Sequence, residues 1–121
     1  MPKLKNIRFS KDGAYGDKIF IANSQKEPDT FKLLENFYNQ LCAKYPDNFL
    51  PIYCNNKHKY ATIRFKIDKK FRKNDIYDIE FVIKKKTSND KTYINCYLEK
   101  AKLIKRGEEE DEGEILDLDF E

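Results

Sequence analysis

The stretch YATIRFKI, residues 60–67, decides the fold, because its apolar and polar residues alternate along its whole length. A period of two places the apolar side chains on one face of a β-strand and the polar ones on the other. The buried face is expected to consist of Ala61, Ile63, Phe65 and Ile67. The face toward water is expected to present Tyr60, Thr62, Arg64 and Lys66. Strands with one wet face are typical of antiparallel sheets.

The same alternation recurs on both sides of the polar turn KKKTSNDK, residues 84–91. Before the turn, a strand is expected over residues 76–84, with Tyr77, Ile79, Phe81 and Ile83 sharing a face. After it, residues 92–105 predict a long strand with Ile94, Cys96 and Leu98 inward. A bend near residues 99–102 is expected to return Leu103 or Ile104 to the core.

The first half of the chain predicts two short strands and one helix. Strands are expected over residues 4–9 and 18–23. Apolar positions then recur at steps of three and four from Phe31 to Tyr45, which predicts an amphipathic helix whose stripe packs on the core. Asp29 or Thr30 is the expected cap, and Pro46 ends the helix. The following segment, residues 47–59, is expected to be irregular.

These elements predict a mainly β fold, a small five-stranded barrel of OB type with one α-helix. An open sheet with a helix packed on it is the alternative architecture. The barrel is expected to occupy residues 1–106 as an OB-like nucleic-acid-binding domain. Residues 107–121 carry nine acids and no base, and such a block of like charge is expected to form a disordered acidic tail.

The charge of the chain is divided between these two parts. All 24 lysines and arginines lie at or before Arg106 together with 12 acids, so residues 1–106 have a net charge of +12. The tail has a net charge of −9. A surface this basic predicts a polyanionic partner, and nucleic acid is favoured over a merely well-solvated surface.

Catalysis, cofactors and metal ions have little support in the sequence. The three cysteines are far apart, the single histidine lies in a lysine-rich loop, and no phosphate-binding or dinucleotide-binding glycine motif occurs. Aspartates at the predicted turns could form a metal site only if they clustered, and aspartate is common in turns because its side chain caps backbone N–H groups. No apolar run is long enough for a signal peptide or a membrane span, so a cytoplasmic protein without an enzymatic activity is expected.

Cations mixed with aromatic side chains favour single-stranded nucleic acid, because phosphates need positive charge and bases stack on rings. A duplex reader would present a basic helix to the major groove, and the predicted helix carries only Lys32 and Lys44 as bases. For Phe71 a role as a core plug is equally open, and outward tyrosines are also common in ordinary strands. The predicted contact residues are Tyr60, Arg64, Lys66, Lys69, Lys70, Phe71, Arg72, Lys84, Lys85, Lys86, Tyr93 and Tyr97.

With its sheet and its tail the chain resembles the phage-type single-stranded DNA-binding proteins of the gene 2.5-like OB-fold family. The likeness rests on three features: a helix between an early strand and YATIRFKI, a long closing hairpin over residues 75–105, and an acidic tail with Phe120 near its end. Glu121 follows Phe120, whereas such tails usually end on the phenylalanine itself.

The resemblance implies sequence-independent binding and protection of single-stranded DNA in replication and recombination. It also implies that the tail recruits replication proteins such as a polymerase or a helicase/primase, in the host cytoplasm if the protein is viral. In the tail, Leu116, Leu118 and Phe120 alternate with acids, and an extended segment would present them to one partner surface. Two alternatives stay open: an inhibitor whose acidic tail mimics DNA, and an RNA-binding barrel. The sequence does not decide the oligomeric state, and a homodimer is open.

Overall fold

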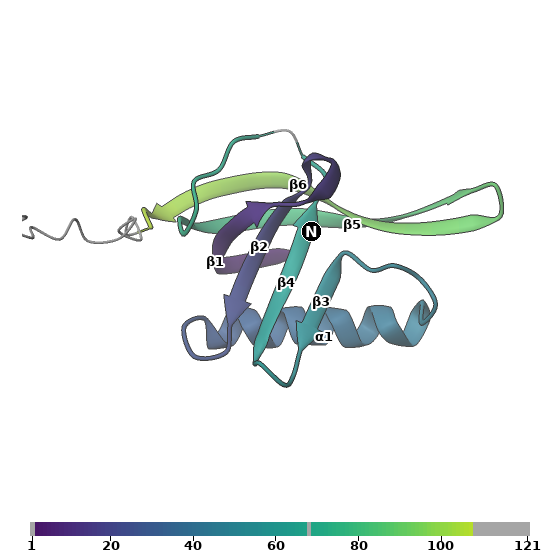
Figure 1. Ribbon diagram of the computed structural model, residues 1–121, viewed down its shortest axis with the longest axis horizontal. Coiled ribbons are helices and arrows are strands. Elements are labelled where there is room, and N and C mark those ends of the chain that lie inside the picture. Colours follow the sequence, from purple (N-terminus) through teal and green to yellow (C-terminus); the bar gives the residue numbers. More distant parts are fainter. Residues whose placement is uncertain (1, 68, 108–121) are drawn as a thin grey trace, which may run out of the picture.

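The computed structural model describes residues 2–67 and 69–107, and in this part the chain is mainly β with one α-helix (Figure 1). The helix, α1, spans Pro28–Lys44, and a short 3-10 turn, η1, spans Ala14–Gly16. The strands are β1 (Lys3–Asp12), β2 (Lys18–Asn23), β3 (Ile52–Asn55), β4 (Tyr60–Phe65), β5 (Ile76–Ser88) and β6 (Lys91–Lys105).

Five of the strands close into a barrel. β1 pairs antiparallel with β2 and β5, β2 pairs with β4, and β5 pairs with β6. The ring closes where β4 meets β6 in parallel, at Phe65 opposite Cys96, and the backbone N–H of Lys66 donates to the Cys96 carbonyl at 3.0 Å. This closed five-stranded barrel with one helix confirms the predicted OB-type architecture over the open sheet.

The core fills the barrel and the space between the barrel and α1. Phe20, Phe65 and Phe81 are fully buried and meet edge to face, at centroid distances of 5.5 Å for both Phe20–Phe65 and Phe65–Phe81. α1 lies across one end of the barrel (Figure 1), and Phe31 and Leu34 are buried beneath it. The predicted stripe of the helix is therefore core packing, as expected.

Two boundaries in this region differ from the prediction. Residues 52–55, expected to be irregular, form β3, which pairs only with β4 at the edge of the sheet. A strand of four residues has too few alternating apolar and polar positions to be recognised from the sequence. The helix begins at Pro28 rather than at Phe31, because proline is tolerated in the first turn, where its missing N–H has no partner to lose. Thr30 does not cap the helix, since its hydroxyl donates to the carbonyl of Lys5 in β1.

β5 and β6 form a long hairpin that projects beyond the barrel (Figure 1). Its two-residue turn consists of Asn89 and Asp90, whose φ angles of 50° and 63° suit the left-handed conformation that tight hairpins require. A bulge occurs at Glu99, as the predicted bend required. The expected return of the strand end to the core is wrong, because Leu103 and Ile104 are 38% and 45% exposed.

The end of β6 is fixed to the barrel by Asp75, which is fully buried. Its carboxylate accepts hydrogen bonds from the Gly107 N–H at 2.7 Å, from Arg106 at 3.0 Å and from the Tyr77 hydroxyl at 3.3 Å. A Cβ atom on Gly107 would lie 2.4 Å from the backbone of Asn74, so only glycine fits there. The predicted tail lies, from residue 108 onward, outside the described residues.

Candidate nucleic-acid interface

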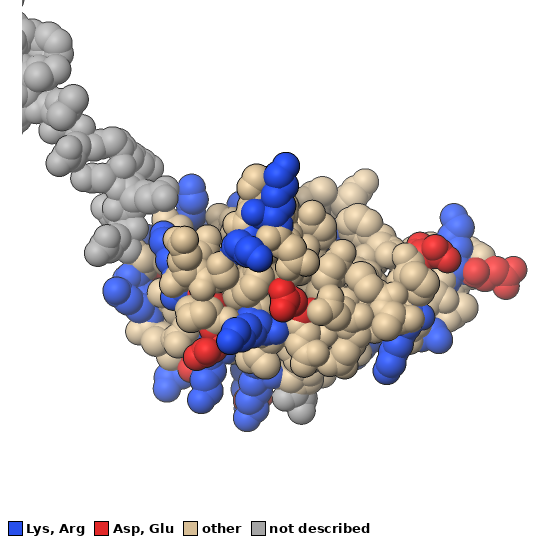
Figure 2. Space-filling view, turned by 90° about the horizontal axis from the view of Figure 1, so that it is seen from below, with Lys and Arg blue, Asp and Glu red and all other residues tan. Residues whose placement is uncertain are grey.

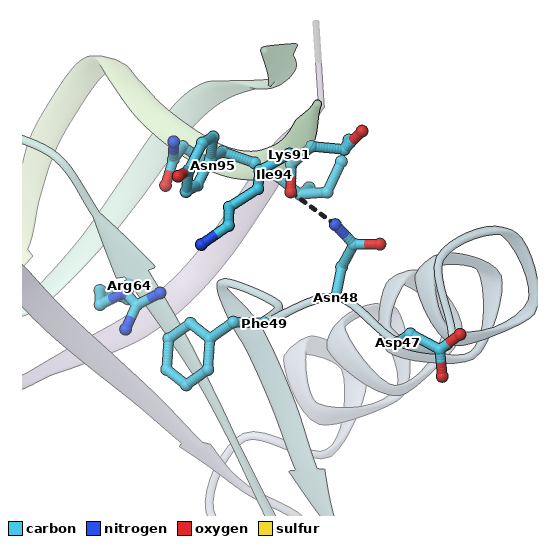
Figure 3. A pocket seen from close by; sticks show the side chains of 9 residues that line it. Asp47, Asn48, Phe49, Arg64, Lys91, Ile94 and Asn95 are labelled. Carbon is cyan, nitrogen blue, oxygen red and sulfur yellow. Dashed lines mark hydrogen bonds between the residues drawn. The ribbon is translucent and has the colours of Figure 1, made fainter. Parts of the chain in front are cut away.

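A groove lies between the projecting hairpin, the loop that joins α1 to β3, and the outer face of β4 (Figure 3). We name it the hairpin groove, and its volume is about 340 Å³. It is lined by Asp47, Asn48, Phe49, Arg64, Lys91, Thr92, Tyr93, Ile94 and Asn95. The groove therefore combines two rings, two cations and several polar groups on one concave surface.

Two aromatic side chains of this groove are exposed to solvent. Phe49 is 76% exposed and Tyr93 is 46% exposed. The guanidinium carbon of Arg64 lies 4.5 Å from the centroid of the Phe49 ring (Figure 3). Such a cation on one face of a ring is favourable, and the high exposure of Phe49 leaves the rest of its ring available for stacking.

Arg64 is held in this position by Asp17, the residue that follows η1. The Asp17 carboxylate is almost fully buried and lies 3.3 Å from Nε of Arg64 and 2.9 Å from Nζ of Lys66. One buried acid thus fixes two of the predicted cations and offsets half of their charge. The same contact ties the β1–β2 loop, with Tyr15 98% exposed at its tip, to β4.

The hairpin is attached to the α1–β3 loop at the other end of the groove. The side-chain amide of Asn48 donates to the Thr92 carbonyl at 2.6 Å (Figure 3). Close by, the Lys85 ammonium lies 5.5 Å from the centroid of the Tyr45 ring at the end of α1. These two contacts join the hairpin to the α1–β3 loop and to the end of α1.

The predicted contact residues do not all gather at this groove. Arg64 and Tyr93 line it, and Lys66 joins them through Asp17. Tyr60 lies at the opposite end of β4, where it pairs with Asn23 and Asn55. On the hairpin, Lys84 lies 5.2 Å from the Tyr97 ring centroid. The remaining predicted cations are exposed on the hairpin or on the β4–β5 loop, namely Lys69, Lys70, Arg72, Lys85 and Lys86.

Phe71 packs against the aromatic core. Its ring packs against Phe9, Phe20 and Tyr77, at centroid distances of 5.5, 5.3 and 5.2 Å. This ring closes one end of the barrel core, which is the plug interpretation that the sequence left open. The prediction that Phe71 stacks on bases has no support in this packing, because its neighbours are the rings of the core itself.

Sequence reasoning missed several residues of the groove. Phe49 and Asn48 fall in the segment expected to be irregular, and Lys91 was treated only as part of a turn. Asp17 is one of the carboxylates that the sequence places in turns, and there it holds Arg64 of β4 and Lys66 just after this strand. A phenylalanine next to Leu50 in a loop with no apolar periodicity is the one signal that could have drawn attention to Phe49.

The charged surface is not uniform. Seen from below, Lys and Arg side chains gather on the part of the molecule away from the projecting hairpin, both basic and acidic side chains lie at the hairpin, and much of the face between them is uncharged (Figure 2). Within residues 2–67 and 69–107, no group of three potential ligands could hold a metal ion. No helix in the same ranges is both long enough and apolar enough to cross a membrane.

The buried thiols are poorly suited to nucleophilic chemistry. Burial raises the pKa of Cys96 to about 12. The pKa of Cys54 is also raised, first by burial and then by the nearby carboxylate of Glu35. The thiolate is the reactive form of cysteine, so both side chains stay protonated and inert near neutral pH.

Comparisons with protein-family models, with curated proteins and with solved structures found no match to this chain. The resemblance to phage-type single-stranded DNA-binding proteins therefore stays a prediction. Function has to be argued from the barrel, the groove and the distribution of charge.

Proposed function

We propose that this protein is a non-catalytic, sequence-independent single-stranded DNA-binding protein that holds the strand in the hairpin groove. The observation that carries the proposal is the presence of exposed rings and cations in one groove: Phe49 lies against Arg64, and Tyr93 and Lys91 line the same groove. Single-strand binders combine stacking platforms for bases with positive charge for phosphates. An OB-type barrel of five strands supports the proposal, because this architecture commonly binds oligonucleotides through its loops and the face of two strands.

The composition of the groove supports binding without sequence preference. Every base has a π-face, so a ring such as Phe49 or Tyr93 accepts any base, whereas base edges are distinguished by fixed donors and acceptors. The side-chain amide of Asn48 is one such donor, but it is engaged by the Thr92 carbonyl. The Asn48 amide is thus not free to select one base over another.

We further propose a role in DNA replication and recombination, with the acidic tail as the contact to replication proteins. The support is the alternation of Leu116, Leu118 and Phe120 with acids, together with the family resemblance. These residues lie outside the described ranges, so the groove and the tail are proposed on separate grounds. The host cytoplasm is the proposed location.

The proposal is tested by fluorescence anisotropy with labelled oligo-dT, a duplex of equal length, and an RNA oligomer of the same sequence. We expect the protein to prefer single strands over duplex, with an affinity that falls as salt rises by a slope of about −0.7 for each neutralised phosphate. RNA and DNA are compared directly, because stacking and phosphate contacts are common to both.

Single substitutions locate the binding to the groove. Phe49→Ala and Tyr93→Ala should each weaken binding by about 5- to 150-fold, since a stacked base is worth about 1–3 kcal/mol. The matched control is Leu33→Ala, which removes an apolar side chain that is 43% exposed on α1 and is not among the residues that line the groove. Equal affinity for duplex, or no loss in either ring variant, would refute the proposal. A protein that binds no oligonucleotide at all would instead favour the inhibitor whose tail mimics DNA.

A further inference from the structure

The outer face of β6 carries polar and aromatic side chains along most of its length. In the first half of the strand Ile94 and Cys96 are buried, so Tyr93, Asn95 and Tyr97 lie on the opposite, outer face. Tyr93 and Asn95 line the hairpin groove, and Tyr97 continues the same row toward the barrel. Figure 1 shows β6 running from the projecting turn at one end of the molecule to the start of the tail at the other.

The bulge at Glu99 keeps this row on one face. Leu98 pairs with Phe81, and the next pair is Lys100 with Glu80, so Glu99 is one extra residue in β6. In a regular strand, even-numbered residues would follow Ile94 and Cys96 into the core. The extra residue exchanges the two faces, and Lys100 and Lys102 emerge exposed on the side of Tyr93 and Tyr97.

Beyond the bulge the row enters a second groove, of about 530 Å³, between β1, β5, β6 and the β4–β5 loop. Five lysines and three acids line it. Two of the acids are already engaged: Glu80 lies 3.4 Å from Nζ of Lys3, and Asp78 accepts the backbone N–H of Asn6 at 3.1 Å. Within the described ranges no ion pair involves Lys69, Lys100 or Lys102. With five lysines against three acids, the lining of this groove has an excess of two positive charges.

We propose that a bound single strand continues from the hairpin groove along the outer face of β6, past Tyr97, into this second groove. There Lys69, Lys100 and Lys102 contact its phosphates. The inference rests on the proposed function and extends it from a pocket to a track.

At about 3.3 Å per residue, the nine steps from Tyr93 to Lys102 span about 30 Å. That is the length of about nine stacked nucleotides at 3.4 Å each, and of fewer in an extended strand. Such a length falls within the roughly 4–16 nucleotides that one OB fold covers.

The test compares a short and a long oligomer, dT4 and dT16, with the double variant Lys100→Gln/Lys102→Gln. We expect the variant to bind dT16 at least fivefold more weakly than the wild-type protein, with a salt slope smaller by about 0.7 for each lost phosphate contact. Binding of dT4, which fits within the hairpin groove, should change less than twofold. Thermal unfolding checks that these surface substitutions leave the fold intact.

The matched control is Lys57→Gln/Lys59→Gln in the turn between β3 and β4, which removes the same charge at exposed positions outside both grooves. Equal losses in the two double variants, or an equal loss for dT4 and dT16, would overturn the track while leaving single-strand binding in place. An unchanged affinity for dT16 would overturn it as well. If the wild-type protein binds neither oligomer, the proposed function fails together with the track.

Discussion

Replacing Asp75 by alanine should destabilise the fold more than any other removal of a charged side chain. Asp75 is fully buried and accepts three hydrogen bonds, of which one comes from the hydroxyl of the buried Tyr77 and one from the N–H of the half-buried Gly107. A buried donor left without a partner costs about 1–3 kcal/mol. The third partner, Arg106, has a side chain that is 63% exposed and can turn to water, so its loss adds less than about 1 kcal/mol. The total for Asp75→Ala is about 3 kcal/mol.

Urea unfolding at pH 7, followed by circular dichroism, measures this loss directly. For a domain of this size 1 kcal/mol corresponds to about 4–8 °C in the melting temperature, so a thermal scan should move down by about 12–24 °C. Tyr77→Phe removes one donor and should cost about 1 kcal/mol. Asp78→Ala is the matched control, since Asp78 accepts a single, exposed hydrogen bond from Asn6 and should matter by less than about 1 kcal/mol. If Asp75→Ala is no more destabilising than Asp78→Ala, the carboxylate does not anchor the end of β6 and the reasoning fails.

Three further predictions concern chemistry, the tail and the hairpin. Because Cys96 has a pKa of about 12 against an ordinary value of 9.0, its contribution to stability is complete below pH 9 and is lost as the pH rises toward 12. The free energy of unfolding measured in urea should therefore fall above pH 9 by up to about 1.4 kcal/mol per pH unit, and this fall should shrink in Cys96→Ala. Deleting residues 108–121 should tighten oligo-dT binding and reduce its salt sensitivity at low salt, because a tethered segment of charge −9 competes for the basic barrel. Asn48→Ala should raise amide exchange about fivefold in the hairpin near Thr92, since one net hydrogen bond of about 1 kcal/mol is lost.

A specific result would refute each of these three predictions. An identical pH dependence in the wild-type protein and Cys96→Ala would remove the thiol as its cause. Unchanged DNA affinity after the deletion would mean that the tail does not compete for the binding surface. For the hairpin, Gln40→Ala removes an exposed side-chain hydrogen bond within α1 and should leave exchange near Thr92 unaffected. Equal exchange in Asn48→Ala and Gln40→Ala would show that the amide does not restrain the hairpin.

The sequence predicts the barrel well because its main strands are long and have one wet face. Alternation in residues 60–65 and 76–83 leaves a clear record of which side chains are buried, and the structure follows it residue by residue. The alternation is too short to predict β3, because its four residues include only two buried positions. The exposure of Leu103 and Ile104 was mispredicted because hydrophobicity alone does not reveal where the core ends.

The candidate site is harder to predict because it is assembled from distant segments. Phe49 and Tyr93 are more than forty residues apart, and only the tertiary fold brings the α1–β3 loop opposite the hairpin. Arg64 could be placed on an outer face from the period of β4, yet its partner Asp17 lies in a turn where an acid attracts no attention. Phe71 shows the reverse case, in which a ring surrounded by lysines in the sequence is packed among rings in the fold.

The closure of the barrel dictates when the protein can fold as it leaves the ribosome. β1 pairs with β2 on one edge and with β5 on the other, where Lys3 lies opposite Glu80. The barrel closes where β4 pairs with β6, at Phe65 opposite Cys96. A nascent chain that ends before β5 can form the β1–β2 hairpin and α1, but one edge of β1 stays unpaired and the aromatic core stays open. Because the closing contacts join residues so far apart in the sequence, they form late and slowly compared with local structure. If synthesis stalls within the second half of the chain, the incomplete barrel exposes apolar side chains and an unpaired strand edge, and it is prone to aggregate. Completion of β6 buries these side chains and closes the barrel.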